Sequence, residues 1–328
     1  MNIESLSRMT GQQEALWRDF LDRAGLTPDG EWEQTVLIWD GDELIAAGSR
    51  QENLLKFLAV DPFRQGEGLL ATVVTELRQE AFRQGHRHLF LYTKPANEYL
   101  FSSLLFYPVA KTDKVLLMED RKNGIRNFLD TLPLSSAEGL VGAAVMNCDP
   151  FTLGHRYLIE TAARECARLY VFVLSEDKGR FSAKDRMEMV KLGTADLSNV
   201  TVLPTGPYLI SSSTFPTYFL KDRDQAGQIQ CLLDIEIFCR YFTPKFGITR
   251  RYVGTEPLSP MTNLYNEALE QHLPGRGIGL HQIPRLERNG APISASAVRK
   301  ALSESDLTAL GSLLPHSTLT YLQQNNLM

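Results

Sequence analysis

One stretch in the second half of the chain constrains the fold more than any other: an apolar run, a short turn and a helix start. Leu140–Met146 is the apolar run and predicts a buried strand, Asn147–Phe151 predicts a turn, and Thr152 opens a helix. Ligands of a parallel sheet bind at the carboxyl ends of its strands, where a helix start offers free backbone N–H groups and a positive dipole end. The stretch therefore predicts an anion site, with phosphate as the natural ligand.

Four residues of this stretch are candidate phosphate-binding residues. Thr152 can cap the helix, Gly154 lets a ligand approach the backbone closely, and His155, one turn into the helix, can point a ring N–H at the same phosphates. Asn147 in the turn completes the set. The alternative is that Thr152 is only a cap, Gly154 a packing glycine and His155 a surface residue.

Three segments, in order along the chain, resemble signatures of the nucleotidyltransferase superfamily. Asp149–His155 has the sequence DPFTLGH and resembles the T/HxGH signature. Phe181–Arg186, with the sequence FSAKDR, and Ile293–Arg299, with the sequence ISASAVR, resemble two further signatures at suitable distances. The resemblance implies a Rossmann-like α/β domain with a parallel sheet that binds ATP.

The same resemblance implies roles for residues near the predicted sheet edge. Arg186 is expected to face the site, and Gly254, which follows a predicted strand, is expected to admit the adenine and ribose. Lys178 and Arg180 lie in a polar loop after another strand, where they would close on the triphosphate or on the second substrate, or simply be surface charges. The role of Glu256 is also left open by the sequence: it would orient a substrate or a metal, or be a solvated surface residue.

The last signature segment is the predicted site of the β- and γ-phosphates. Ser294 is expected to cap a helix, Ser296 to add a hydroxyl, and Arg299 to reach back with a bidentate charge. Ala295 and Ala297 depart from the usual ISSTxxR pattern. These departures remove hydroxyls but keep the cap and the cation.

The first third of the chain has a different order of predicted elements. Strands alternate with helices around one glycine-rich turn, Gln65–Leu70. The predicted segments are a helix at 5–22, strands at Thr35–Trp39, Glu43–Ser49 and Leu54–Val60, a helix through Gln84, a strand at His88–Thr93, a helix at Asn97–Phe106 and a strand at Tyr107–Met118.

This order resembles the acetyl-CoA-dependent N-acetyltransferase superfamily. In that family, backbone N–H groups of a turn like this one hold the coenzyme A pyrophosphate at a helix start. Gln65, Gly66 and Gly68 are therefore the candidate residues for a coenzyme-A-like arm, although Leu70 stands where the family usually has Gly or Ala. The alternative is a plain glycine turn between a strand and a helix.

A connecting helix at Arg121–Leu132 and a short linker at Pro133–Ser136 separate the two patterns. The predicted architecture is an N-acetyltransferase-like α+β domain at 1–133, followed by a nucleotidyltransferase domain at 134–328. A chain of 328 residues is long enough for two such cores.

Composition restricts the classes of partner and location. The net charge of −5 gives no general attraction to nucleic acid or to an anionic membrane. No apolar segment approaches a membrane-spanning length and the N-terminus has no signal-peptide core, so a cytoplasmic location is expected. The four cysteines, Cys148, Cys166, Cys231 and Cys239, show no CxxC spacing, which predicts reduced thiols and neither zinc nor disulfides.

An acetyltransferase-like domain followed by a nucleotidyltransferase domain resembles the citrate lyase ligase family over essentially the whole chain. Asn147–His155, Ser211–Lys221 and Val253–Tyr265 carry this likeness. The resemblance implies two steps. Acetate and ATP give acetyl-adenylate and pyrophosphate, and the acetyl group then passes to the thiol of a phosphoribosyl-dephospho-coenzyme A arm on the acyl carrier subunit of citrate lyase.

The expected catalytic residues follow from the chemistry of the first step. Attack on the α-phosphorus gathers negative charge, so catalysis is positioning plus charge stabilisation. His155 is expected to stabilise the α-phosphate, with Lys178 and Arg299 on the leaving pyrophosphate. Mg²⁺ would be carried by the phosphates, since no carboxylate cage for a metal is visible.

Two other functions stay open at this point. One is a nucleotidyltransferase that joins ATP to a phosphorylated acceptor such as phosphopantetheine or nicotinamide mononucleotide. The other is a nucleotide-binding regulatory protein that binds ATP without turning it over. His155, Lys178 and Arg299 together favour an enzyme.

Overall fold

The computed structural model describes residues 1–135, 137–210, 215–220, 225–256, 259–288 and 290–328. Ser211–Ser213, the first residues of the segment Ser211–Lys221 that carries the family likeness, lie outside the described residues. Contacts between residues divide the chain into two compact units. The first unit consists of Met1–Gly124 and Pro216–Ile229, and the second consists of Ile125–Phe215 and Gln230–Met328. The predicted boundary between residues 133 and 134 differs from this division in two ways. Helix α4 (Gly124–Asp130) belongs almost entirely to the second unit, and Pro216–Ile229 belongs to the first.

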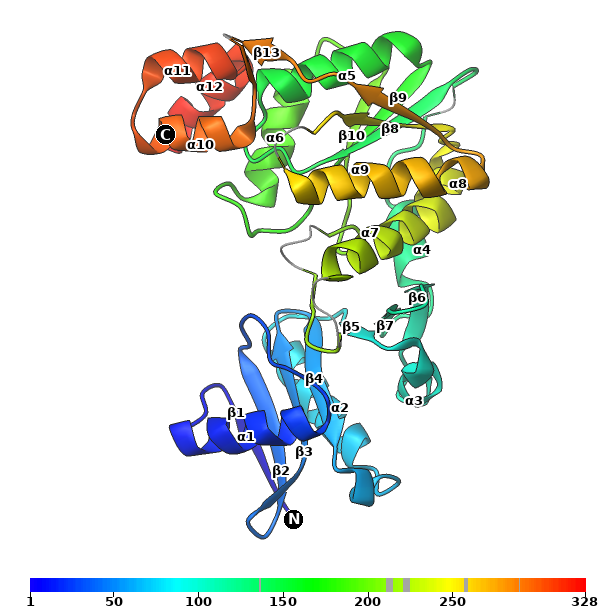
Figure 1. Cartoon of the computed structure of the whole chain (residues 1–328), viewed down its shortest axis with the longest axis vertical. Helices are drawn as coiled ribbons and strands as arrows, with labels where there is room; N and C mark the ends of the chain where they lie inside the picture. The colour runs from blue at the N-terminus through cyan, green and yellow to red at the C-terminus, as the bar shows by residue number, and fades with distance from the viewer. Residues whose placement is uncertain (136, 211–214, 221–224, 257–258, 289) are drawn as a thin grey trace. The chain divides into compact units, whose positions relative to one another are not determined.

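The first unit is built on a mixed sheet (Figure 1). Its described strands, in spatial order, are β1 (Asn2–Leu6), β2 (Gln34–Asp40), β3 (Glu43–Gln51), β4 (Leu54–Val60), β5 (Phe90–Thr93), β7 (Leu116–Glu119) and β6 (Tyr107–Lys111). All neighbours are antiparallel except β4 and β5, which are parallel. In these two fully described strands, only Leu54 pairs with Phe90 and Leu55 with Leu91. Beyond these pairs β4 and β5 separate towards their carboxyl ends.

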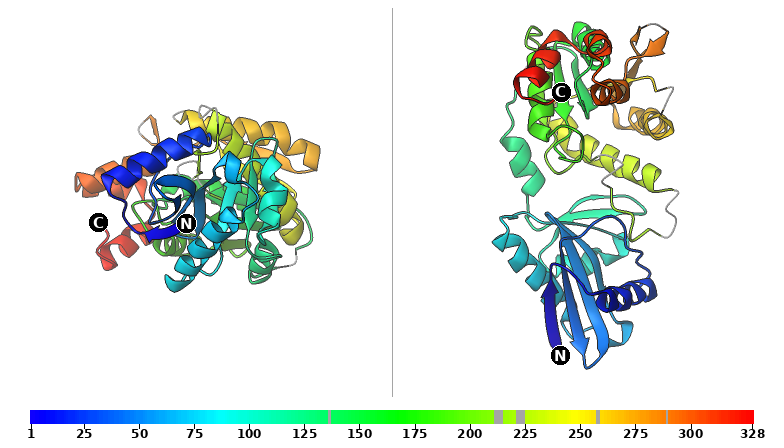
Figure 2. Two further views of the ribbon diagram at one scale, coloured as in Figure 1. Left: turned by 90° about the horizontal axis from the view of Figure 1, so that it is seen from below. Right: turned by 90° about the vertical axis from the view of Figure 1, so that its left-hand side faces the viewer.

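Helices α1 (Gly11–Arg23) and α2 (Leu69–Arg83) cover opposite faces of this sheet (Figure 2). Val73, Val74 and Leu77 of α2 are fully or almost fully buried in its core. The short helices are η1 (Pro62–Arg64), η2 (Pro95–Asn97) and α3 (Glu98–Ser102).

Two predicted elements of this unit are wrong in extent. The helix predicted at 5–22 begins at Gly11, where Thr10 and Gln13 form a capping box, and Asn2–Leu6 is instead an edge strand paired with β2. The strand predicted at Tyr107–Met118 is a hairpin, because a turn closed by Thr112 N–H on the carbonyl of Val115 divides it.

The second unit has an all-parallel sheet with helices packed against it (Figure 1). Its described strands, in spatial order, are β10 (Val200–Pro204), β9 (Arg168–Val173), β8 (Val141–Met146), β11 (Arg250–Gly254) and β12 (Gly279–Ile283). The chain runs outward from β8 to β10 and then returns to β11 beside β8. This reversal creates a topological switch point at the carboxyl ends of β8 and β11, where ligands of such sheets bind.

The remaining elements belong to the second unit, except that the first turn of α7 (Ala226–Ile229) belongs to the first unit. They are α5 (Leu153–Glu165), α6 (Ala183–Gly193), α7 (Ala226–Ile237), the π-helical stretch η4 (Phe238–Phe242), α8 (Thr243–Phe246), α9 (Pro260–His272), η5 (Pro274–Arg276), β13 (Glu287–Arg288), β14 (Ala291–Pro292), α10 (Ala295–Ser303), α11 (Leu307–Leu313) and α12 (His316–Gln324). Ile159 of α5 and Val298 of α10 are buried in one core, so these two helix starts are held by common packing. The predicted fold class, an α+β domain followed by a parallel α/β domain, is confirmed.

Candidate functional site

The start of α5 holds His155 in one ring orientation. Thr152 caps the helix, and its backbone N–H donates to Nδ1 of His155 at 3.1 Å, while its hydroxyl lies 3.0 Å from the same nitrogen. Because Nδ1 accepts the backbone hydrogen bond, the proton of the neutral imidazole is on Nε2. The neutral form of His155 therefore carries an N–H donor on Nε2, one turn into the helix.

The charge state of His155 follows from its surroundings. Burial, and to a smaller extent the nearby guanidinium of Arg285, together lower its pKa to about 4. The imidazole is therefore neutral at physiological pH and remains a donor. Sequence reasoning missed Arg285, which follows β12 and is fixed by hydrogen bonds to the carbonyl of Thr255 and to Glu256.

Gly154 has a packing role, which was the alternative left open by the sequence. A side chain here would place its Cβ 3.1 Å from the carbonyl oxygen of Ile293. The missing side chain therefore lets the segment that precedes α10 lie against the start of α5. The first and third signature segments meet through this contact.

Asp149 ties the turn after β8 to the loop after β9. Its buried carboxylate accepts the N–H groups of Arg180 and Phe181 at 3.1 and 2.9 Å. Gly179 makes room for it, because a Cβ there would lie 2.7 Å from the carboxylate. Arg299 also reaches this turn, since its Nη1 donates to the carbonyl oxygen of Asp149 at 2.5 Å and lies 3.6 Å from the carboxylate.

Arg186 is buried beneath the same turn. Its Nη1 donates to the carbonyl oxygen of Asn147 at 2.8 Å and also to the side-chain oxygen of Asn147, and its Nη2 donates to the carbonyl of Glu176. These bonds hold both loops at the carboxyl edge of the sheet. Arg186 therefore positions Asn147 after β8 and the loop after β9 that contains Glu176.

The start of α10 supplies the polar groups predicted for the outer phosphates. Ser294 caps this helix by accepting the N–H of Ala297 at 3.1 Å, and Ser296 accepts a hydrogen bond from Arg299 at 3.0 Å. The Arg299 side chain keeps 38% of its surface exposed, so it can also contact a ligand.

Two predicted residues lie at the same sheet edge outside this hydrogen-bonded network. Lys178 is exposed in the loop after β9. Gly254 ends β11, and its carbonyl accepts the side-chain amide of Asn266 at 2.9 Å. A Cβ at Gly254 would make only ordinary contacts, so packing alone does not demand glycine there.

The glycine turn of the first unit opens α2. Gly66 and Gly68 have φ angles of +89° and +76°, which favour glycine, and Gly68 is the residue before the helix. The turn borders a cavity of about 810 Å³ where β4 and β5 separate. Its described lining includes Leu58–Val60, Arg64–Gly66, Gly68–Ala71, Leu91–Lys94, Asn97, Leu100 and Leu104.

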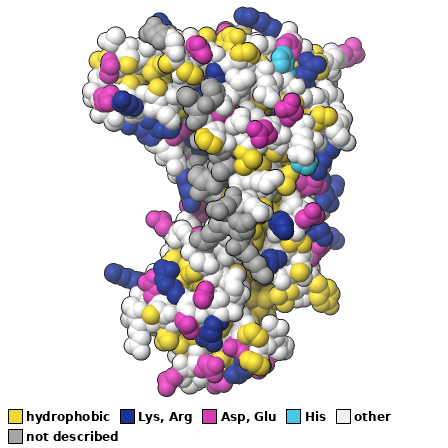
Figure 3. Space-filling view, in the orientation of Figure 1, with side chains coloured by type: hydrophobic (Ala, Val, Ile, Leu, Met, Phe, Trp, Pro, Cys, Tyr) yellow, Lys and Arg dark blue, Asp and Glu magenta, His cyan; other side chains and the backbone are white. Residues whose placement is uncertain are grey.

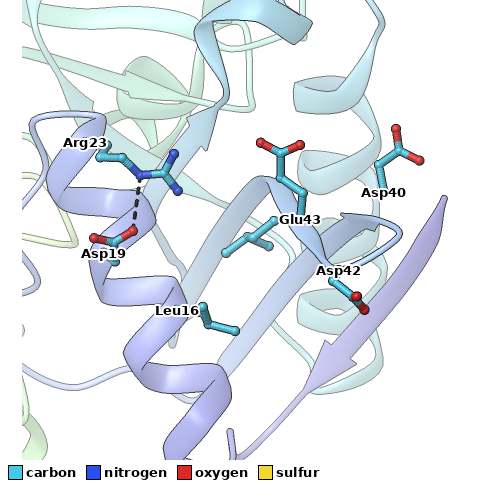
Figure 4. Close-up of a pocket in the computed structure, with 7 residues that line it drawn as sticks. Leu16, Asp19, Arg23, Asp40, Asp42 and Glu43 are labelled. Carbon is cyan, nitrogen blue, oxygen red and sulfur yellow. Dashed lines mark ion pairs between the residues drawn. The ribbon is translucent and has the colours of Figure 1, made fainter.

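A second hollow of this unit has a different character (Figure 4). It lies between α1 and the β2–β3 hairpin, and Asp19 forms an ion pair with Arg23 at 3.2 Å within it. Asp40, Asp42 and Glu43 give it an acidic lining, which does not suit a phosphate.

The sequence model described as "Citrate lyase ligase C-terminal domain" matches residues 141–322. A citrate (pro-3S)-lyase ligase of Klebsiella pneumoniae is 38% identical over 95% of this chain and 93% of its own length. Among solved structures, Escherichia coli ElaA aligns with 37% of this chain and 99% of its own at 14% identity and a TM-score of 0.32. Thermotoga maritima TmcAL bound with alpha-thio ATP aligns with 57% of this chain and 56% of its own at 14% identity and a TM-score of 0.36. The chain belongs to the citrate lyase ligase family.

Proposed function

We propose that this chain activates citrate lyase by ATP-dependent acetylation of the thiol on the phosphoribosyl-dephospho-coenzyme A arm of its acyl carrier subunit. Membership of the ligase family supports the overall reaction and the use of ATP. The observation that carries the adenylating step is the start of α5 at the switch point, with a neutral His155 whose proton is on Nε2.

In the first step, a carboxylate oxygen of acetate attacks the α-phosphorus of ATP, and the bond to the bridging oxygen of pyrophosphate breaks. Negative charge on the α-phosphate is stabilised by His155 Nε2–H and by the free N–H groups of α5. Arg299, Lys178 and the hydroxyls at the start of α10 bind the leaving pyrophosphate. Gly254 leaves room for the nucleoside.

Magnesium belongs to this step as a partner of the phosphates. Among the residues that the structure describes, no group of three metal-binding side chains forms a site. The ion would therefore be carried by the triphosphate and would neutralise part of its charge.

In the second step, the arm's thiol loses its proton to solvent and the resulting thiolate attacks the acetyl carbonyl carbon. The bond between this carbon and the phosphate oxygen breaks, which releases AMP and leaves the acetyl thioester. The chain's own cysteines are not required. Cys148, beside the phosphate turn, is buried, and burial raises the pKa of its thiol far above the physiological range. We propose that the turn containing Gln65, Gly66 and Gly68 binds the phosphate-bearing part of the arm.

Other partners are less compatible with the surface. The net charge is −5, and basic and acidic side chains are interspersed on the face seen in Figure 3, so this face offers no extended positive surface to nucleic acid or an anionic membrane. Within the described part of the chain, no helix is both long and apolar enough to cross a membrane. We propose a cytoplasmic enzyme because the reaction consumes ATP.

The proposal is tested by ATP–pyrophosphate exchange with purified protein and Mg²⁺. Exchange that depends on acetate supports the adenylating step. Exchange only with phosphopantetheine or nicotinamide mononucleotide would replace it by a nucleotidyltransferase reaction. ATP binding without exchange, even with the acyl carrier subunit present, would indicate a regulatory protein.

A further inference from the structure

A short segment from the second half of the sequence is built into the first unit. Pro216–Leu220 lies between Phe215, which belongs to the second unit, and residues outside the described part, yet its contacts place it with the first unit. Tyr218 and Phe219 are only 5% and 3% exposed. The segment is therefore a constituent of this core.

Hydrogen bonds fix the segment at both its backbone and its side chains. The Thr217 hydroxyl donates to Asp29 at 2.9 Å, and the carbonyl oxygen of Tyr218 accepts the N–H of Thr27 at 2.9 Å. The Tyr218 hydroxyl donates to the carbonyl oxygen of Tyr92 on β5, also at 2.9 Å. These bonds place Tyr218 against the strand that borders the cavity.

Aromatic contacts place the same residue at the point where β4 and β5 separate. The ring of Tyr218 packs edge-on against Phe57 of β4 at a centroid distance of 4.9 Å, and against Phe219 at 5.2 Å. Tyr218 and Phe219 both line the cavity. Their rings therefore form part of its wall.

The glycine turn, which follows β4, lines the same cavity. From Phe57, which contacts Tyr218, to Val60 at the end of β4 the chain advances three residues, roughly 10 Å at the rise of a strand. Gly66, Gly68 and the start of α2 suit phosphate at one end, and half-buried Lys94 adds a positive charge to the lining. Arg64 also lines the cavity, but Asp40 and Glu67 pair with its guanidinium.

We propose that Tyr218 and Phe219 determine specificity in this cavity: they form an aromatic stop that admits a coenzyme-A-like arm ending in a thiol or acetyl thioester and excludes longer acyl groups. The inference rests on the proposed binding of the arm at the glycine turn. It adds residues from the adenylating half of the sequence to the arm-binding unit. Rejection of longer thioesters would keep wrongly acylated arms out of the cavity.

The test measures binding to the full-length protein by calorimetry, with dephospho-coenzyme A and its acetyl and octanoyl thioesters as probes. We expect the thiol and acetyl forms to bind with similar Kd, and the octanoyl form to bind at least about tenfold more weakly, the scale set by 1.4 kcal/mol of steric conflict. In Phe219→Ala and Tyr218→Leu, the octanoyl penalty should largely disappear. Phe82→Ala, which removes an exposed ring of α2 outside the cavity, should keep it.

Two results would overturn the inference. One is an octanoyl form that binds the unaltered protein as tightly as the thiol. The other is an unchanged penalty in both cavity variants, with circular dichroism and thermal unfolding showing that each is folded. If none of the three probes binds, the proposed arm site fails as well, whereas acetate-dependent exchange still reports separately on the adenylating step.

Discussion

The start of α5 and the start of α2 use the same backbone device for different purposes. Both follow a strand and offer free N–H groups to phosphate. At α5, a histidine of fixed tautomer and an arginine from a distant helix are added. At α2, glycines with positive φ and a large cavity are added. Backbone N–H groups at a helix N-terminus are enough to bind a phosphate. Stabilising the charge that develops during a reaction also requires side chains held in a fixed position.

The largest expected effect comes from removing the imidazole at α5. His155→Ala should lower acetate-dependent ATP–pyrophosphate exchange by about 10²–10³-fold, because one preorganised donor to the reacting phosphate is lost. Binding of dephospho-coenzyme A should not change. Exchange rates and calorimetry on the same preparations measure both.

The matched control for this variant is His316→Ala, since His316 is exposed at the start of α12. Near-normal exchange in His155→Ala would remove this residue from the mechanism. A cooperative thermal unfolding transition establishes that the lost capping contact has not unfolded the protein.

The complementary variant disturbs the start of α2. Gly68→Val forces a β-branched residue to adopt a φ of +76°, so the turn must distort. We expect the Kd for dephospho-coenzyme A to rise by about tenfold or more and acetyl transfer to fall, while exchange is spared. The strain of one such residue is of the order of 1–3 kcal/mol.

Gly85→Val is the control for backbone strain, because Gly85 has a φ of +89° beyond the end of α2 and does not line the cavity. Equal loss of exchange and of acetyl transfer in Gly68→Val would contradict separate roles for the two helix starts.

The sequence predicted α5 and α2 well because their signals are local. An apolar run, a cap and a glycine within a few residues define each helix start. The segment Pro216–Leu220 and the edge strand Asn2–Leu6 were not predicted. Their places depend on partners far away in the sequence, such as Asp29 and Trp39, and long-range pairing leaves no local pattern.

The same distinction applies within the candidate site. The signature segments contain the candidate residues, and in the structure the first and third segments are joined by the hydrogen bond from Arg299 to the carbonyl oxygen of Asp149. The electrostatic effect of Arg285 on His155 could not be predicted, because it depends on the three-dimensional arrangement of β12 and α5. The bonds that direct Arg186 into the turn are likewise tertiary.

A smaller effect is expected from the carboxylate that braces the α5 site. In Asp149→Asn, an amide nitrogen replaces one of the two oxygens that accept the N–H groups of Arg180 and Phe181, so the loop loosens. We expect kcat/KM for ATP in the exchange reaction to fall about tenfold, and the free energy of unfolding to fall by roughly 1–3 kcal/mol. Binding at the α2 turn should be unaffected.

Asp130→Asn makes the same chemical change at an exposed ion pair with Lys245 and should leave exchange unchanged. If Asp149→Asn retains full kcat/KM, the two loops do not need this brace for catalysis.

The last effect concerns pH and the start of α5, where the first turn carries a histidine with a lowered pKa. The pKa of His155 is about 4 in the folded protein and near its ordinary value of 6.5 when unfolded. Between these values the unfolded chain binds a proton that the folded chain does not, so the folded state loses stability as the pH falls from about 6.5 towards 4. The full difference is about 3 kcal/mol, because one pKa unit corresponds to about 1.4 kcal/mol. Urea unfolding across this range should therefore show a shallower pH dependence for His155→Gln, which cannot titrate, than for the unaltered protein. Parallel pH profiles would mean that His155 is not held neutral by its surroundings, and the assignment of its Nε2–H as a permanent donor would then fail.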